Sequence, residues 1–224
     1  MPVIDDTWLV VPLFNEAQVI ADVIVQARQT FPKIVCVDDG STDTSAEQAR
    51  AAGAVVVSHP INLGQGAALQ TGFDYVLADP AMQYAVTFDS DGQHQVSDAE
   101  EMVERLRRGD VDVVFGSRFL DARTQPGGLK RLVLRVATGM SNLTTRTRLT
   151  DAHNGLRALN RTALSTIRIR QNRMAHASEI VAQVARSPLR YTEVPVHVLY
   201  TDYSRSKGQS IWNSVNILTE LLYR

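Results

Sequence analysis

Short apolar segments alternate with amphipathic segments through the first half of the chain. The apolar segments, each with the length of a buried strand, are 8–11, 34–37, 54–57, 84–88 and 111–115. The segments with the apolar spacing of helices are 17–30, 44–52, 65–78 and 98–108. Strands that alternate with helices in this way predict an α/β fold, with a mainly parallel, doubly wound sheet and helices on both of its faces.

The pattern changes after Gly116, where arginine-rich segments take over. We expect a loop at 124–128, an alternating apolar and polar run at 190–199, and a last helix with one broad apolar face. That face consists of Ile211, Trp212, Val215, Leu218, Leu221 and Leu222. Core packing, an oligomer contact and contact with a membrane interface all fit such a face. We interpret the second half as a basic helical C-terminal extension of one domain, 1–224.

Length and composition narrow the class of protein. A chain of 224 residues, 44% of them hydrophobic, is long enough for one substantial core. The single cysteine, Cys36, lies in an apolar segment, which excludes a disulfide framework and fits a reducing compartment. No charged leader opens the sequence, and no apolar stretch reaches the roughly 20 residues that span a bilayer. We therefore expect a cytoplasmic protein that is neither secreted nor membrane-spanning.

The formal net charge of −1 conceals a strong polarity along the chain. Residues 1–112 contain 6 Lys and Arg against 18 Asp and Glu, a net charge of −12, whereas residues 113–224 contain 17 against 6, a net charge of +11. This division fits a protein that handles a cation in one half and an anion, or an anionic surface, in the other. Ordinary charge pairing between the halves of a fold would give the same count.

Two carboxylates follow the fourth apolar segment. Asp89 and Asp91 are one residue apart, and a strand that ends in this way delivers both acids to the carboxyl edge of the sheet. Mg²⁺ or Mn²⁺ takes one or two protein carboxylates and completes its shell with water and phosphate oxygens. Gln93 offers a further carbonyl oxygen. An acidic turn after a strand would show the same pattern. The residues at the ends of the other strands are needed to distinguish a metal site from such a turn.

The first two predicted strands also end in polar or aromatic residues. After Pro12, Phe14 could lie against a flat base and Glu16 could accept hydrogen bonds from its ring N–H groups. After the second strand, Asp38 or Asp39 could bind a ribose hydroxyl or the base, as an acid after a strand does in dinucleotide-binding folds. A turn that caps the next helix is the alternative for both acids.

A glycine cluster opens the helix after the third strand. Gly64 and Gly66 would let the backbone and the helix N-terminus approach an anionic or hydroxyl-rich ligand, although a plain tight turn fits as well. The cluster is not a phosphate-binding loop of the G-x-x-x-x-G-K-[ST] kind, and Leu69 stands where G-x-G-x-x-G requires its last glycine. That argues against a dehydrogenase. Four such strand ends at one edge of a sheet predict a nucleotide pocket with a metal at its phosphate end.

The order P-x-F-N-E, V-D-D-G-S-T-D, N-x-G-x-G, D-S-D-G-Q and G-S-R resembles that of the family-two inverting glycosyltransferases. It is most similar to their dolichol-phosphate mannosyltransferase-like branch, which loads polyprenyl phosphate carriers. The resemblance covers about residues 7–210 and implies a GT-A fold and a metal-dependent hexosyltransferase. It implies that 1–115 binds the nucleotide sugar and the metal and that 116–224 binds the acceptor.

The resemblance also implies a role for individual residues. The implied catalytic residues are Asp89, Asp91, Asp151 and Arg118. The implied metal ligands are Asp89, Asp91 and Gln93, and the implied acceptor-phosphate contacts are Arg118 and Arg131. The implied donor nucleotide site is Pro12, Phe14, Glu16, Asp38, Asp39, Gly64, Gly66, Arg205 and Lys207. The segment D-A-H-N-G-L-R at 151–157 is similar to the family's D-x-x-x-G-F-R segment beside the sugar.

Two departures from the family pattern stand out. Gln65 replaces the usual Lys of N-x-G-K-G, which removes one possible cation. The C-terminal transmembrane helices of many relatives are absent, so a membrane surface or a small membrane protein is an expected partner. A nucleic acid is not.

The acceptor decides whether the reaction needs a base. A phosphate monoester is largely dianionic at neutral pH and is already a nucleophile, whereas a sugar hydroxyl needs a base within hydrogen-bond reach. Asp151 is the candidate base by resemblance, and Glu179 is the second candidate. Glu179 and His176 share a helix face, where they could orient an acceptor, contribute to a metal site, or form a structural hydrogen bond.

These observations predict transfer of a sugar, with inversion, from a nucleoside diphosphate sugar to a polyprenyl phosphate of the dolichyl or undecaprenyl type. The enzyme would use Mg²⁺ or Mn²⁺ and associate peripherally with the cytoplasmic face of the membrane. One alternative is a saccharide hydroxyl acceptor in cell-surface glycan synthesis, and another is a nucleotide-sugar-binding protein without turnover. A nucleotidyltransferase is disfavoured, because those enzymes usually carry a Gly-rich basic loop where this chain has P-L-F-N-E.

Overall fold

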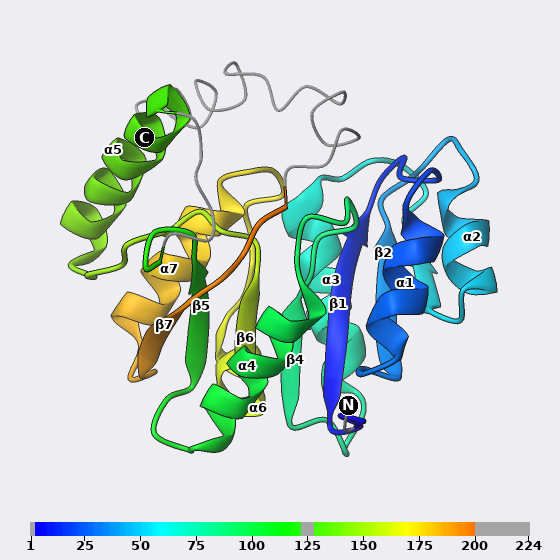
Figure 1. Ribbon diagram of the computed structural model, residues 1–224, viewed down its shortest axis with the longest axis horizontal. Coiled ribbons are helices and arrows are strands. Elements are labelled where there is room, and N and C mark those ends of the chain that lie inside the picture. The colour runs from blue at the N-terminus through cyan, green and yellow to red at the C-terminus, as the bar shows by residue number, and fades with distance from the viewer. Residues whose placement is uncertain (1–2, 122–127, 200–224) are drawn as a thin grey trace.

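The computed structural model describes residues 3–121 and 128–199, which form one seven-stranded sheet with helices on both faces (Figure 1). The strands are β1 Thr7–Leu13, β2 Lys33–Asp38, β3 Val55–Ser58, β4 Tyr84–Thr87, β5 Val113–Ser117, β6 Arg157–Asn160 and β7 Tyr191–Pro195. The helices are α1 Ile20–Arg28, α2 Ser45–Ala51, α3 Gln65–Leu77, α4 Val96–Arg107, α5 Gly128–Thr145, α6 Arg161–Thr166 and α7 His176–Arg186.

The strand order in the sheet is β3-β2-β1-β4-β6-β5-β7. All neighbouring pairs are parallel except those of β6, which runs antiparallel to both β4 and β5. The sequence therefore predicted the fold class correctly, and the five strands and four helices expected in the first half all form. It did not predict β6, whose four residues begin with Arg157 and end with Asn160 and so lack a strand-like apolar pattern.

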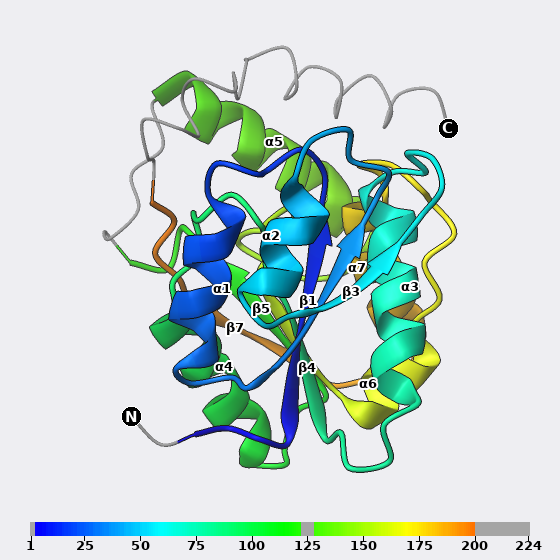
Figure 2. The same ribbon diagram turned by 90° about the vertical axis from the view of Figure 1, so that its right-hand side faces the viewer.

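Two apolar layers cover the sheet. On one face, Leu9, Val11 and Leu13 of β1 pack in the same core cluster as buried residues of α1, α2 and α4. On the other face, Val10 packs with buried residues of α3, α6 and α7. Figure 2 shows α1 and α4 on one side of the sheet and α3 and α6 on the other. Successive residues of β1 point to opposite faces of the sheet, and a layer of helices packs against each face.

The carboxyl ends of β1, β2 and β4 lie side by side because these strands are parallel neighbours. In the register, Leu13 pairs with Asp38, and Val10 pairs with Thr87. The predicted functional segments follow directly on these ends, at the upper edge of the sheet in Figure 1. Helix α5 also lies toward this edge and packs against α7. The fold therefore gathers the predicted segments at one place.

Candidate active site

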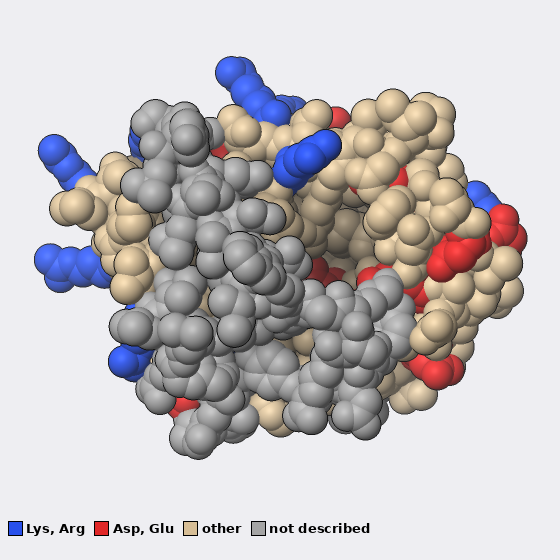
Figure 3. Space-filling model, turned by 90° about the horizontal axis from the view of Figure 1, so that it is seen from above, with Lys and Arg blue, Asp and Glu red and all other residues tan. Residues whose placement is uncertain are grey.

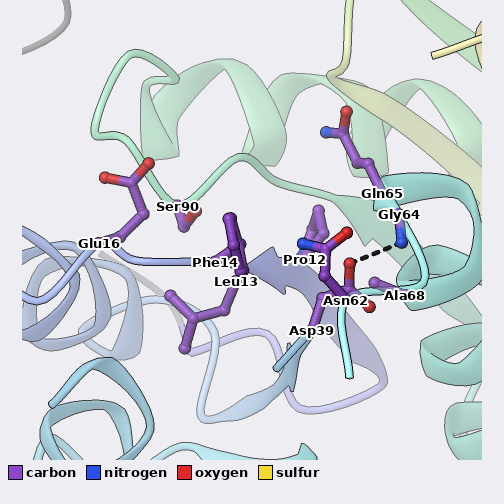
Figure 4. Close-up of a pocket in the computed structure, with 10 residues that line it drawn as sticks. All are labelled: Pro12, Leu13, Phe14, Glu16, Asp39, Asn62, Gly64, Gln65, Ala68 and Ser90. Carbon is purple, nitrogen blue, oxygen red and sulfur yellow. Dashed lines mark hydrogen bonds between the residues drawn. The ribbon is translucent and has the colours of Figure 1, made fainter. Parts of the chain in front are cut away.

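Two adjoining cavities open at the carboxyl edge of the sheet. The first, of about 260 Å³, is lined by Pro12, Leu13, Phe14, Glu16, Asp39, Asn62, Gly64, Gln65, Ala68 and Ser90 (Figure 4). The second, of about 250 Å³, is lined by Pro12, Glu16, Gln65, Asp89, Ser90, Asp91 and Gln93. Four residues line both cavities, so the two form one cleft. Seen from above, this edge is hollowed, and acidic side chains lie in the hollow (Figure 3).

The loop after β1 is tied to the loop after β2. Asn15, which has left-handed backbone with φ 54°, donates its N–H to Ser41 Oγ at 3.0 Å, and its Oδ1 accepts the Thr42 N–H at 2.9 Å. The Glu16 N–H donates to Ser45 Oγ at 2.7 Å. These bonds fix the backbone that carries Phe14, whose side chain is 43% exposed in the cleft. An exposed ring beside a cavity is available to a flat ligand.

Asp38 and Asp39 have separate tasks in the structure. Asp39 is buried and accepts hydrogen bonds from the N–H groups of Leu63 at 2.9 Å and Gly64 at 2.7 Å, and His59 Nδ1 lies 2.7 Å from its Oδ1. It thus holds the segment before α3 while it lines the first cavity. Asp38 does not line either cavity, and its Oδ1 accepts the Ser41 N–H at 3.1 Å. This hydrogen bond forms a turn after β2, which fits the alternative interpretation of Asp38 as a turn residue before the next helix.

Gly64 and Gly66 pack closely against the backbone of residues 171–172. A Cβ atom on Gly64, which has φ +106°, would lie 2.3 Å from the Asn172 carbonyl oxygen, and one on Gly66 would lie 2.0 Å from the Gln171 carbonyl oxygen. The Gly66 N–H donates to the Asn172 carbonyl at 2.8 Å. Both glycines are therefore needed for a close approach of two backbone segments. Gly64 in addition lines the first cavity.

Asp89 is held on both of its oxygens. His94 Nε2 lies 2.9 Å from Oδ2, and the Gln65 amide donates to Oδ1 at 3.4 Å. His94 is buried and its ring meets Phe88 edge to face at 5.6 Å between centroids. Burial raises the pKa of Asp89, but the charge and hydrogen bond of His94 and the charge of Arg157 outweigh it, so the pKa lies below its usual value. Asp89 is therefore a fixed carboxylate at neutral pH.

Asp91 is less constrained. Its Oδ1 accepts the Gln93 N–H at 3.0 Å, and within the described residues no donor reaches Oδ2. Burial and the charge of Asp89 raise the pKa of Asp91 to about 6. Two carboxylates thus face the second cavity with an excess of negative charge, which a bound cation would relieve.

Arg118 and Asp151, which the resemblance assigned to different tasks, form an ion pair with each other. Arg118 Nε and Nη2 donate to the two oxygens of Asp151 at 2.6 and 2.8 Å, in the bidentate geometry that arginine favours. Burial raises the pKa of Asp151, but the charge and hydrogen bonds of Arg118 hold it below its usual value. Glu193 accepts the Asp151 N–H at 3.1 Å and fixes the backbone there. Neither Arg118 nor Asp151 lines the two cavities.

The structure adds β6 and the segment before it to the site. A Cβ atom on Gly155 would lie 2.6 Å from Asp89 Oδ2, so the segment before β6 packs directly on that carboxylate. Arg157 is fully buried, and none of its guanidinium nitrogens has a hydrogen-bond partner among the described residues. Burial lowers the pKa of Arg157 to about 10, against the opposing charges of Asp89 and Asp151. The sequence signal was a glycine two residues before an arginine, which becomes informative only once β6 is paired with β4.

His176 and Glu179 form separate hydrogen bonds. Glu179 Oε2 accepts the N–H groups of Arg170 at 2.9 Å and Gln171 at 2.8 Å. His176 is buried, its Nδ1 lies 2.8 Å from the Arg173 carbonyl oxygen, and burial together with the charge of Arg157 lowers its pKa to about 4. These contacts fit the structural alternative for both residues.

Several predicted residues cannot be placed in the cleft. Arg131 lies in α5, but its side chain is outside the described part of the structure. Arg205, Lys207, the loop at 124–127 and the apolar face of the last helix lie outside the described residues altogether. Within 3–121 and 128–199, no three His, Cys, Asp or Glu residues gather so as to hold a metal ion by themselves. In the same ranges no helix is both long and apolar enough to cross a bilayer.

Comparison with known proteins gives consistent results. The family described as Glycosyl transferase family 2 matches residues 8–168. The uncharacterized protein MJ1222 of Methanocaldococcus jannaschii is 33% identical over 97% of this chain and 91% of its own length. The UDP-N-acetylglucosamine–dolichyl-phosphate N-acetylglucosaminyltransferase of Methanococcus voltae is 27% identical over 96% of this chain and 94% of its own length.

The fold also has relatives among solved structures. Glucosyl-3-phosphoglycerate synthase from Mycobacterium tuberculosis, crystallised with Mn²⁺, UDP and phosphoglyceric acid, superposes with a TM-score of 0.69. The match covers 97% of this chain and 77% of that chain, at 19% sequence identity. At this identity the likeness concerns the fold alone, and it confirms the GT-A fold that the sequence motifs implied.

Proposed function

The chain belongs to glycosyl transferase family 2, and from this premise we propose that it transfers a sugar, with inversion, from a nucleoside diphosphate sugar to a polyprenyl phosphate. One observation carries the proposal: a continuous cleft has an exposed aromatic ring at one end and paired carboxylates at the other. A nucleoside diphosphate has the matching order of parts, with a flat base at one end and a metal-binding diphosphate at the other.

The residues at the acidic end fit Mg²⁺ or Mn²⁺. Asp89, Asp91 and the Gln93 side chain offer oxygen donors around the second cavity, where burial and the charge of Asp89 raise the pKa of Asp91 to about 6. Fewer than three acidic ligands suffice, since these ions complete their shell with water and phosphate oxygens. When bound, the cation would neutralise the charge that develops on the leaving diphosphate.

The chain's own residues then have distinct tasks. Pro12, Phe14 and Glu16 bind the nucleoside, while Asp39 holds the segment that closes the first cavity. His94 and Gln65 keep Asp89 in one orientation. Arg118 and Arg131 meet the acceptor phosphate. The bidentate ion pair with Asp151 holds the guanidinium of Arg118 in a fixed orientation.

A lipid phosphate is the acceptor that the chemistry of Asp151 favours. A carboxylate whose pKa is lowered and whose two oxygens both accept bonds from Arg118 is a weak base, and a dianionic phosphate needs none. The Methanococcus voltae relative is named as a transferase to dolichyl phosphate. We place the reaction at the cytoplasmic face of the membrane, with the protein bound peripherally.

The central experiment measures thermal stabilisation by UDP, GDP and dTDP, with and without Mn²⁺. Stabilisation follows RT ln(1 + [L]/Kd), so the preferred nucleotide gives the largest shift in Tm. Asp89→Ala is expected to keep the fold but to abolish sugar transfer and the Mn²⁺-dependent part of the shift. Asp110→Asn, a carboxylate substitution in the exposed pair with Arg105 before β5, is the matched control. Full activity of Asp89→Ala would refute the proposal.

A saccharide hydroxyl acceptor is the second candidate, because Asp151 is the first residue of the segment 151–157, which resembles the family's D-x-x-x-G-F-R segment beside the sugar. Asp151→Asn should stop base-assisted transfer to a hydroxyl but affect transfer to polyprenyl phosphate much less. Parallel assays with polyprenyl phosphate and with a saccharide, using a panel of labelled donors, separate the two acceptors. Donor binding without transfer or hydrolysis in any of these assays would instead identify a binding protein.

A further inference from the structure

The ionisable residues that line the cleft all carry negative charge. They are Glu16, Asp39, Asp89 and Asp91. A nucleoside diphosphate brings negative charge of its own, and like charges a few ångströms apart repel strongly when they are partly buried. A divalent cation offsets part of this repulsion, but it sits at the acidic end of the cleft. The opposite wall of the first cavity, at the start of α3, therefore needs a separate source of positive potential.

The N-terminus of α3 is not that source. The Asn172 carbonyl accepts the N–H groups of Gly66 at 2.8 Å and Ala67 at 3.4 Å, and so occupies the position where an anion would bind a helix end. Gln65, the first residue of the helix, is uncharged and turns its amide to Asp89. The backbone segment that caps the helix is fixed in turn, because Glu179 accepts the N–H groups of Arg170 and Gln171.

The same segment brings an arginine next to a residue of the cavity wall, although the arginine is not itself a lining residue. The Cγ atom of Arg173 lies 3.2 Å from the position that a Cβ atom of Gly64 would occupy, and Gly64 lines the first cavity. Arg173 is exposed, and no carboxylate of the described residues forms an ion pair with it. The carbonyl of this arginine accepts the His176 N–H at 3.2 Å, and within 3–121 and 128–199 no side chain forms a hydrogen bond with its guanidinium.

We propose that Arg173 is a donor-binding residue whose guanidinium contacts the diphosphate of the nucleoside diphosphate sugar from the α3 side of the cleft. This inference rests on the proposed function and deepens it. The planar fork of arginine pairs with phosphate oxygens through two parallel hydrogen bonds. Arg173 would thus approach the diphosphate from the side of Gly64 and add its charge to that of the cation at the acidic end of the cleft.

The test compares Arg173→Gln with Arg168→Gln, which removes the same charge from the same segment. Arg168 pairs with Asp74, nine residues along α3 from Gln65, so it lies roughly 13 Å down the helix from the cleft. Binding of UDP, GDP and dTDP, and of the matching nucleosides, is measured by calorimetry with Mn²⁺ present. Arg173→Gln is expected to weaken binding of the preferred diphosphate about tenfold, the value of one charge-assisted hydrogen bond, and to leave nucleoside binding unchanged. Arg173→Lys should recover part of the loss.

Three outcomes would overturn the inference. If Arg173→Gln binds the diphosphate as tightly as Arg168→Gln does, Arg173 makes no contact with it, and the proposed function stands. If the nucleoside and the diphosphate are weakened equally, Arg173 acts on the base or ribose instead of the phosphates. If wild-type protein binds none of the three diphosphates, the proposed function fails together with this inference. Tm values of the variants, measured without ligand, show whether each remains folded.

Discussion

At the scale of single residues, the carboxylates of the cleft differ in the number of hydrogen bonds that they accept from the protein. Asp39 is fully engaged in holding the segment before α3, and Asp89 is held by His94 and Gln65. Asp91 accepts one backbone hydrogen bond, and its pKa is raised to about 6 by burial and by the neighbouring charge. A raised pKa means that the ionised form of Asp91 destabilises the folded state without ligand. Asp91 is therefore retained at a cost in stability, as expected of a functional group.

We predict that Asp91→Asn stabilises the protein in the absence of metal and nucleotide. Above pH 6 the wild-type carboxylate is ionised in the folded state, so its neutral replacement should raise the free energy of unfolding by about 1–2 kcal/mol. As the pH falls from 6 toward 3.8, the usual pKa of an aspartate, the wild-type side chain takes up its proton in the folded state and the difference disappears. Urea unfolding of both proteins between pH 4 and 8 measures it. An Asn variant less stable than wild type at pH 7.5 would contradict the assigned pKa.

At the scale of elements, β6 decides how the site is built. It lies antiparallel between β4 and β5, and this pairing places Gly155 opposite Asp89 and Arg157 opposite Thr87. Thr87 Oγ1 donates to the Gly155 carbonyl at 2.5 Å and so ties the two segments together. A strand from the basic half of the chain thus supports a carboxylate of the acidic half. Packing of this kind fixes where a candidate metal ligand points.

Gly155→Ala should therefore impair the site more than the fold. The added methyl group would meet the Asp89 carboxylate at 2.6 Å and push it out of place, which should weaken Mn²⁺-dependent nucleotide binding about tenfold. Gly139→Ala in α5 is the matched control, since its Cβ atom would meet nothing within 4 Å. That control should leave binding unchanged and raise stability by about 0.5–1 kcal/mol through helix propensity. Equal nucleotide affinity in both variants would show that the position of Asp89 does not matter.

At the scale of the whole molecule, the two halves of the sequence form adjoining parts of one sheet, and they differ strongly in charge. Strands β1 to β4 come from residues 1–112 and strands β5 to β7 from residues 113–224, and the pairing of β6 with β4 joins the two sets, so the halves are not separate structural units. The acidic side chains of the first half line the cleft, whereas the second half carries a net charge of +11. Positive charge outside an acidic cleft can attract an anionic surface without repelling the bound cation.

The protein should accordingly bind vesicles that contain anionic lipid, and bind neutral phosphatidylcholine vesicles weakly. Attraction of this kind is screened within a Debye length, so binding should be lost in about 0.5 M NaCl. Cosedimentation at two salt concentrations measures both effects. Binding that is equal on both kinds of vesicle and insensitive to salt would point to apolar insertion in place of charge attraction.

The sequence by itself determined the fold class, the order of five strands and four helices, and the edge of the sheet where the cleft lies. It could do so because apolar periodicity and the residues at strand ends are local features. The tertiary structure decided the rest: that β6 enters the sheet, that Arg118 and Asp151 pair with each other, that Asp39 holds a neighbouring segment, and that Arg173 stands beside Gly64. Each of these features depends on contacts between segments that are distant in the sequence. Such contacts produce no local pattern of apolar and polar residues, so the sequence alone does not predict them.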